Sequence, residues 1–111
     1  MNSEPYIITI VKDFNVAPYG RYPVDGPASG EEFRKTLLAP KLREYDRVHV
    51  VLDGYNRYGR SFLDEAFGGL IREEGFTGED LRRKLTYSHS LIKSMNNVIA
   101  ERIEAAEKAQ Q

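Results

Sequence analysis

The hydrophobic pattern changes its period within one central stretch, residues 47–71, which reads RVHVVLDGYNRYGRSFLDEAFGGLI. Its first part, Val48 to Leu52, is a run of β-branched and aliphatic residues, long enough for a strand covered on both faces and too short for a helix. After a polar loop, hydrophobic residues recur at i, i+3, i+4, i+7 and i+8, the spacing of one helical face. They are Leu63, Ala66, Phe67, Leu70 and Ile71. The stretch therefore predicts a strand, a loop and a helix that Ser61 caps, with Asp64 three residues on.

The flanking segments predict further strands and helices. Residues 6–11 (YIITIV) and 85–88 (LTYS) are strand-like. Ser29 and Glu32 form a capping-box pattern for a second helix, which Pro40 is expected to end or kink. Its expected buried residues are Phe33, Leu37, Leu38 and Leu42. Thr77 begins a pattern for a short helix that ends near Lys84, and Gly75 suits the end of the central helix. Ser90 precedes a long amphipathic helix whose tail, from Glu104, is expected to fray.

Residues 13–27 hold three of the five prolines and two glycines, so irregular structure is expected there. A short edge strand at residues 21–24, joined to the first strand by a turn at 18–20, would make a hairpin. Strands that alternate with helices predict an α/β fold, a small sheet with parallel central strands and helices packed against it. At 111 residues, the chain is expected to form one domain, 1–111, with its core between residues 6 and 103.

Charge and composition narrow the classes of function. The chain contains 16 basic and 17 acidic residues, and this balance argues against broad binding to nucleic acid or to anionic membranes. The absence of cysteine excludes disulfides, thiolate catalysis and cysteine-type zinc sites. No hydrophobic run is long enough to span a membrane, and the MNSEPY start lacks a signal pattern, so a cytoplasmic location is expected. No cofactor and no metal ion is expected.

Three segments carry a resemblance to a known family: DFNVAPYGRYPVDGPASGEEFR, VHVVLDG and GRSFLDEAFGGLIRE. The chain resembles the STAS-like domain family of unknown function, which is related to the STAS domains (sulfate transporter and anti-sigma factor antagonist). The resemblance covers about residues 7–103, and residues 61–70 are its most specific part. It implies a mixed sheet of about four strands flanked by helices, with a long C-terminal helix. It also implies a non-enzymatic role in regulated protein–protein binding, as in signalling.

The resemblance also indicates a position for regulation. In anti-sigma factor antagonists, a partner kinase phosphorylates a serine at the start of the helix after the central strand, and the added charge abolishes binding. When the motif ends are aligned on residues 67–70 (FGGL), that position falls on Asp64 or Glu65, where no hydroxyl is present. Ser61, about one helical turn earlier, is a candidate phosphosite. The implied partner is another regulatory protein, with a kinase-like ATPase and a second copy of the chain as candidates.

The residues after the central strand are the candidate binding site. Arg57 and Arg60 precede Ser61, and a helix start with nearby arginines favours an anion. The alternative is that Ser61 only caps its helix, worth about 1 kcal/mol. The candidate residues for a partner or an anion are Arg21, Asp53, Tyr55, Arg57, Tyr58, Arg60, Ser61, Asp64 and Glu65. The alternative function is a small-ligand site for a phosphate or nucleotide at this helix start.

Other chemistry is weakly indicated. Asp64 and Glu65 could form a carboxylate pair, but adjacent helical residues point about 100° apart and converge poorly on one ion. The interleaved basic and aromatic residues 56–60 are too few to indicate nucleic-acid binding. His49, within a strand, is expected to pack or face an edge, and His89, in a turn, is expected to be solvated. No catalytic set is identified.

Overall fold

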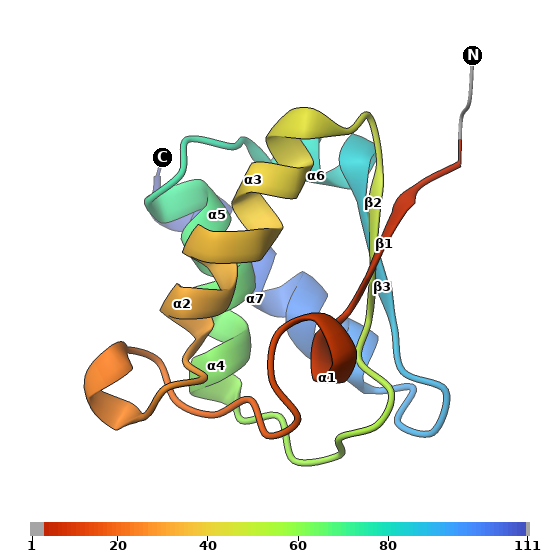
Figure 1. The fold of residues 1–111 in the computed structure, drawn as a ribbon. Helices are drawn as coiled ribbons and strands as arrows, with labels where there is room; N and C mark the ends of the chain where they lie inside the picture. The colour runs from red at the N-terminus through yellow and green to blue at the C-terminus, as the bar shows by residue number, and fades with distance from the viewer. Residues whose placement is uncertain (1–3, 111) are drawn as a thin grey trace.

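The computed structural model describes residues 4–110, and these residues form a three-stranded parallel sheet with helices packed against it (Figure 1). The strands are β1 (Tyr6–Thr9), β2 (Val48–Val51) and β3 (Leu85–Ser88), in the order β1-β2-β3. The predicted strands, their parallel direction and the central place of β2 are confirmed. The chain turns into a short helix, α1 (Ile10–Asp13), directly after Thr9. The expected domain limits, residues 1 and 111, lie outside the described range.

The expected mixed sheet of about four strands is corrected to three parallel strands within residues 4–110. The predicted edge strand at 21–24, and the hairpin with it, are wrong. Pro23 instead opens a 3-10 turn, η1 (Pro23–Asp25). The carboxylate of Asp25 accepts the backbone N–H groups of Arg21 (3.1 Å) and Tyr22 (3.0 Å). These groups are therefore bonded locally and are not available to a neighbouring strand.

The first long helix runs through three parts, α2 (Gly30–Phe33), a π-helical segment η2 (Arg34–Leu38) and α3 (Ala39–Glu44). Ser29 caps it as predicted, because Ser29 Oγ accepts the N–H of Glu32 at 3.1 Å. The helix continues past Pro40, where it was expected to end or kink. The N–H of Ala39 bonds to the carbonyl of Arg34, five residues back. This wider turn directly before Pro40 lets the helix continue without the hydrogen bond that proline lacks.

The central helix also has three parts, α4 (Arg60–Leu63), a π-helical segment η3 (Asp64–Gly68) and α5 (Gly69–Arg72). Its predicted hydrophobic face is buried. The predicted cap is wrong, because the N-cap residue is Gly59 and Ser61 lies exposed inside the first turn. Gly75 follows with a φ of 84°, the left-handed conformation expected at a helix end.

The last helices pack beside β3. The short helix α6 (Gly78–Lys84) begins after Thr77 as predicted, with a capping box in which the side chains of Thr77 and Asp80 each accept the other's backbone N–H. The long helix α7 (Met95–Ala109) begins five residues after Ser90 and continues regularly through the residues expected to fray. Ala106, near its end, is buried. No helix within residues 4–110 is long and apolar enough to cross a membrane.

The helices lie to one side of the sheet (Figure 1). Alternate residues of β2, Val48 and Val50, are buried against them, while His49 and Val51 are only half-buried. β2 was expected to be covered on both faces. The alternation shows that only the face carrying Val48 and Val50 is fully buried. The half-buried His49 ring binds Thr86 Oγ1 (2.6 Å) and Ser88 Oγ (2.9 Å) on the neighbouring strand. Burial lowers the pKa of His49.

Candidate functional site

The irregular loop before α2 folds back onto the start of the central helix. Arg21 in this loop reaches the two acidic residues there: its Nη1 lies 2.7 Å from Asp64 Oδ2 and 3.3 Å from Glu65 Oε1. The loop backbone is held as well, because the N–H groups of Gly30 and Glu31 donate to the carbonyls of Gly20 (2.9 Å) and Arg21 (3.0 Å). Arg21 therefore lies beside the predicted site, although a loop and not a hairpin brings it there.

A pocket of about 450 Å³ lies between this loop and the helix start. Its lining residues are Tyr19, Gly20, Arg21, Tyr22, Asp25, Gly59, Arg60, Ser61 and Phe62. Ser61 and Arg60 are exposed, so the hydroxyl and the guanidinium are both accessible from solvent. The pocket thus joins three of the predicted binding residues with two tyrosines that sequence reasoning did not select.

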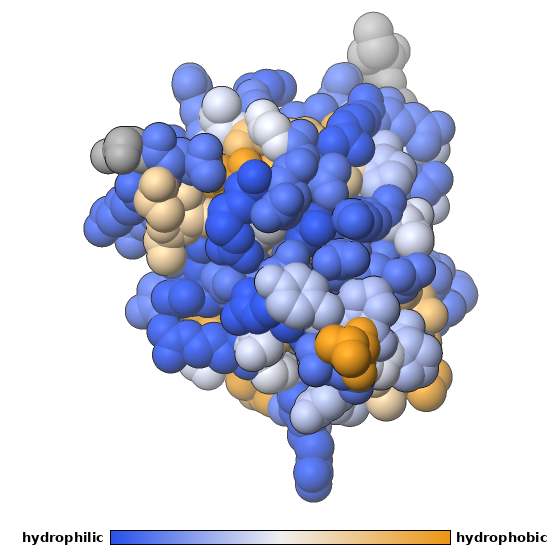
Figure 2. Space-filling model, turned by 90° about the vertical axis from the view of Figure 1, so that its left-hand side faces the viewer, coloured by the Kyte–Doolittle hydropathy of each residue, from blue (hydrophilic) through white to orange (hydrophobic). Residues whose placement is uncertain are grey.

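Large hydrophobic side chains are exposed along the same loop. Val24 is 90% exposed, Val16 74%, Tyr19 64% and Tyr22 46%. The loop lies at the left of Figure 1, and Figure 2, which faces that side, shows a small hydrophobic patch with pale residues around it on a largely hydrophilic surface. Neighbouring exposed hydrophobic and aromatic residues are typical of a surface that binds another molecule. We call these four residues the loop patch.

Asp64 and Glu65 form the centre of an ion-pair network. Asp64 lies within 4 Å of the guanidinium groups of Arg21, Arg72 and Arg102. Burial alone would raise the pKa of Asp64, but hydrogen bonds from Arg21 and Arg72 and the charges of both more than offset it and hold the pKa below its usual value. The neighbours of this acidic pair are arginines, and within residues 4–110 no group of three or more potential ligands could hold a metal ion.

Sequence reasoning missed the buried part of this network. Arg34 is 1% exposed, and its Nη1 donates to both Oε2 and the backbone carbonyl of Glu65 at 2.7 Å. Its Nε donates to Glu74 Oε2 at 2.9 Å, and Arg43 binds the other oxygen of the same carboxylate at 2.9 Å. The sequence did contain a signal for this buried ion pair: an arginine lies between hydrophobic positions of the α2–α3 helix, and an acidic residue lies in the central helix.

The loop after β2 is fastened to the loop after β3. The carboxylate of Asp53 accepts the N–H of Ser90 at 3.1 and 3.2 Å, and hydrogen bonding to Ser90 lowers the pKa of Asp53. His89 was expected to be solvated, but it is 3% exposed. Its Nδ1 accepts the N–H groups of Leu91 and Ile92 at 3.2 Å each, so Nε2 carries the proton and donates to the carbonyl of Tyr55 at 2.9 Å. These bonds keep residues 90–92 out of α7 and give Asp53 a structural role.

The two tyrosines of this loop were expected to be exposed anchors, and the structure corrects this. The Tyr55 and Tyr58 rings meet edge to face with centroids 5.1 Å apart. Tyr58 is 9% exposed, and burial raises the pKa of its hydroxyl, while Tyr55 is half-buried. Arg57 and Arg60 are exposed as expected. The accessible residues of the predicted site are therefore Arg57, Arg60 and Ser61, with Arg21 partly exposed beside them.

These features define an α/β domain whose polar centre, within residues 4–110, consists of arginine–carboxylate pairs. Residues 29–90 match the family described as STAS-like domain of unknown function (DUF4325), and the chain belongs to this family. No curated protein and no solved structure matches it. The match spans α2 to β3 and includes Arg34, Asp64 and Glu65. The loop patch and α7 lie outside the matched residues.

Proposed function

We propose that this protein is a non-enzymatic regulatory module that binds another protein through the surface around Ser61. The surface comprises the exposed residues of the loop at 54–60 and of the helix start at 61–65, together with Arg21 and the loop patch. The observation that carries the proposal is the attachment of Arg21 to Asp64 and Glu65, because it holds the loop against the helix start, where the exposed Tyr19 and Tyr22 line one pocket with Arg60 and Ser61. Exposed tyrosines and arginines are the residue types that most often anchor protein interfaces.

The partner is proposed by analogy with STAS domains that act as anti-sigma factor antagonists. There the partner is a kinase-like ATPase, and we propose a regulatory protein of this kind here. The resemblance places the phosphorylated serine of those domains at Asp64 or Glu65, and arginines pair with both carboxylates. The arginines that could bind a phosphate at this position are already paired with Asp64 and Glu65. Ser61 is an exposed serine at the start of the central helix, and we propose it as the site of a modification that changes binding.

The test compares two substitutions that change charge equally. Arg60→Glu alters the pocket, and Arg47→Glu alters an exposed arginine that precedes β2, at the opposite end of that strand. Proteins captured by each variant from the native host are quantified by mass spectrometry, and binding of a captured protein is repeated with purified components. We expect binding to fall by at least about tenfold for Arg60→Glu. Arg47→Glu should bind as the wild type does.

The alternative small-ligand function predicts a different result. A phosphate or nucleotide held by Arg21, Arg60 and Ser61 would raise the melting temperature by several degrees, since a ligand that binds only the folded state stabilises it. Such a shift with a nucleotide, lost in Arg60→Gln and accompanied by no partner sensitive to Arg60→Glu, would overturn the protein-binding proposal.

A further inference from the structure

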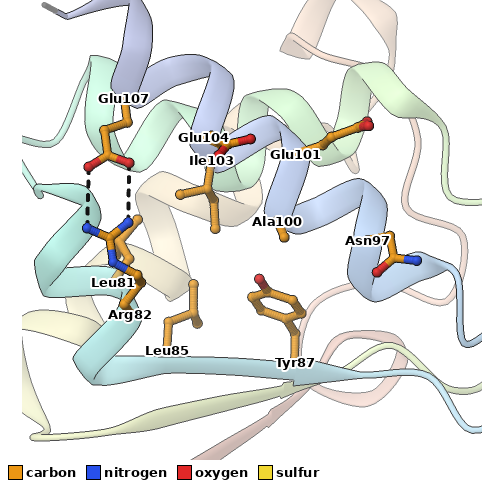
Figure 3. A pocket seen from close by; sticks show the side chains of 10 residues that line it. All are labelled: Leu81, Arg82, Leu85, Tyr87, Asn97, Ala100, Glu101, Ile103, Glu104 and Glu107. Carbon is orange, nitrogen blue, oxygen red and sulfur yellow. Dashed lines mark hydrogen bonds and ion pairs between the residues drawn. The ribbon is translucent and has the colours of Figure 1, made fainter.

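A second surface lies on the other side of the central helix, between β3 and α7. A groove of about 440 Å³ runs there, and Leu81, Leu85, Tyr87 and Ile103 are among its lining residues. Figure 3 shows the side chains of Leu85 and Tyr87 pointing from β3 toward α7, with Ala100 and Ile103 above them. The groove is thus hydrophobic between the strand and the helix.

Acidic side chains line the helix side of the groove. Glu101, Glu104 and Glu107 project from α7, while Arg82 is the basic residue of the lining (Figure 3). Arg82 is already paired with Glu107, at 3.2 Å. Among residues 4–110, no ion pair involves Glu101 or Glu104. Two carboxylates therefore remain available to a cation beside a hydrophobic groove.

The strand side of the groove is a free sheet edge. β3 pairs only with β2 in the described chain. The carbonyl of Ser88 accepts the N–H of Leu52, so Ser88 and Thr86 direct their backbone groups toward β2. Backbone groups alternate along a strand, so those of Tyr87 point outward. The N–H of Leu85 is bonded to the carbonyl of Leu81, which leaves its own carbonyl for an added strand.

We propose that this groove binds an extended segment of a partner protein that carries hydrophobic and basic residues on the same face, at every second position. The segment adds to the free edge of β3 through Tyr87 and the carbonyl of Leu85, as peptides do when they extend a sheet. Successive side chains of a strand point to opposite faces, so the residues that enter the groove and the basic residues that reach Glu101 and Glu104 stand at every second position of the segment. Charge complementarity selects a basic occupant, since an acidic segment would place like charges together. This proposal does not depend on the function assigned to the Ser61 surface.

The probe is a fluorescein-labelled peptide of about six residues, the usual length of a strand. Leucine and lysine take every second position in turn, so that their side chains share one face, and the residues between them are threonine. Affinity is measured by fluorescence anisotropy, and the site is mapped from backbone amide shifts in NMR spectra of the 15N-labelled protein. We expect saturable binding with the largest shifts at Tyr87 and along α7. The matching peptide with glutamate in place of lysine should not bind. A lysine peptide N-methylated at alternate residues, which cannot donate to the edge of β3, should also not bind.

Three variants distinguish binding in the groove from non-specific attraction of a basic peptide to acidic residues elsewhere on the protein. Glu101→Lys with Glu104→Lys should weaken binding by at least about tenfold. Glu44→Lys, which changes an exposed acid on α3, should leave binding unchanged. Ala100→Trp fills the groove from an exposed helical position without a change in charge, and it should abolish binding. Circular dichroism establishes that each variant is folded.

Several results would overturn the proposal. These are the absence of saturable binding, equal affinity for the Glu101→Lys/Glu104→Lys variant, or amide shifts confined to residues around Arg21 and Ser61. Sedimentation of the free protein gives a further test. A dimer that dissociates on Glu101→Lys/Glu104→Lys would assign the groove to a second copy of the chain and not to a peptide.

Discussion

The guanidinium group of Arg34 occupies the space that a side chain at position 69 would need, so Gly69 and Arg34 fit together as a pair. A Cβ atom at Gly69 would overlap Arg34 Nη1, the atom that donates to Glu65. Glycine inside a helix costs about 1 kcal/mol relative to alanine. Here that cost permits the α2–α3 helix and the central helix to place a buried ion pair between them.

The first prediction concerns this contact. Gly69→Ala should lower the free energy of unfolding by about 1–3 kcal/mol, because displacement of a buried side chain outweighs the better helix propensity of alanine. Urea denaturation measures the change. The same substitution in an Arg34→Leu background should cost much less, since the obstructing guanidinium is gone. An equal cost in both backgrounds would show that Arg34 is not the cause.

The second prediction concerns the buried charges. Arg34→Leu leaves Glu65, which is 4% exposed, without its closest partner, and should cost about 3–5 kcal/mol. Replacing both residues, Arg34→Leu with Glu65→Leu, should recover much of this loss, because no unpaired charge then remains buried. The comparison is made by denaturant unfolding of the two single variants and the double variant. A double variant as unstable as the sum of the two single variants would contradict this account.

Local patterns predicted the elements because their causes lie within a few residues. Ser29 and Thr77 cap helices through bonds to residues three positions on, and the period of β2 and the central helix is visible in short windows. The family resemblance added the STAS-like class, which the match over residues 29–90 shows. Both kinds of evidence describe the framework of the domain.

The candidate site was predicted less completely, because its geometry depends on contacts between distant residues. Arg34 and Glu65 are 31 positions apart, and His89 is 34 positions from the Tyr55 carbonyl that it bonds. Arg21 was expected to approach the site only if a hairpin formed. A locally bonded turn at Pro23 formed instead and still brought Arg21 to Asp64. The spacing of residues along the chain does not show which distant residues will contact each other in the fold.

The third prediction concerns pH. The pKa of Asp64 is lowered in the folded protein, so its stabilising effect is complete above the unfolded pKa of about 4 and is lost as the pH falls through the folded value. Asp64→Asn should therefore cost about 2 kcal/mol at neutral pH, the usual size for hydrogen bonds to a charged group. The difference from wild type should shrink below about pH 4. Urea unfolding at several pH values measures it, and a difference that stays constant into acid would contradict the assignment.

The fourth prediction separates the two serines at helix starts. Ser29 Oγ accepts the N–H of Glu32 and is buried, so Ser29→Ala should lower the free energy of unfolding by about 1 kcal/mol or more. Ser61 was predicted to have the same role, but Gly59 is the cap and the Ser61 side chain is exposed. Ser61→Ala should therefore change stability by less than about 0.5 kcal/mol, as expected for a surface substitution. Thermal and urea unfolding of both variants provide the comparison.

Because Ser61→Ala should leave the fold intact, any loss of partner binding in that variant would report directly on the surface around the pocket. A destabilisation by Ser61→Ala as large as that by Ser29→Ala would restore the capping role and remove the reason to assign this hydroxyl to binding.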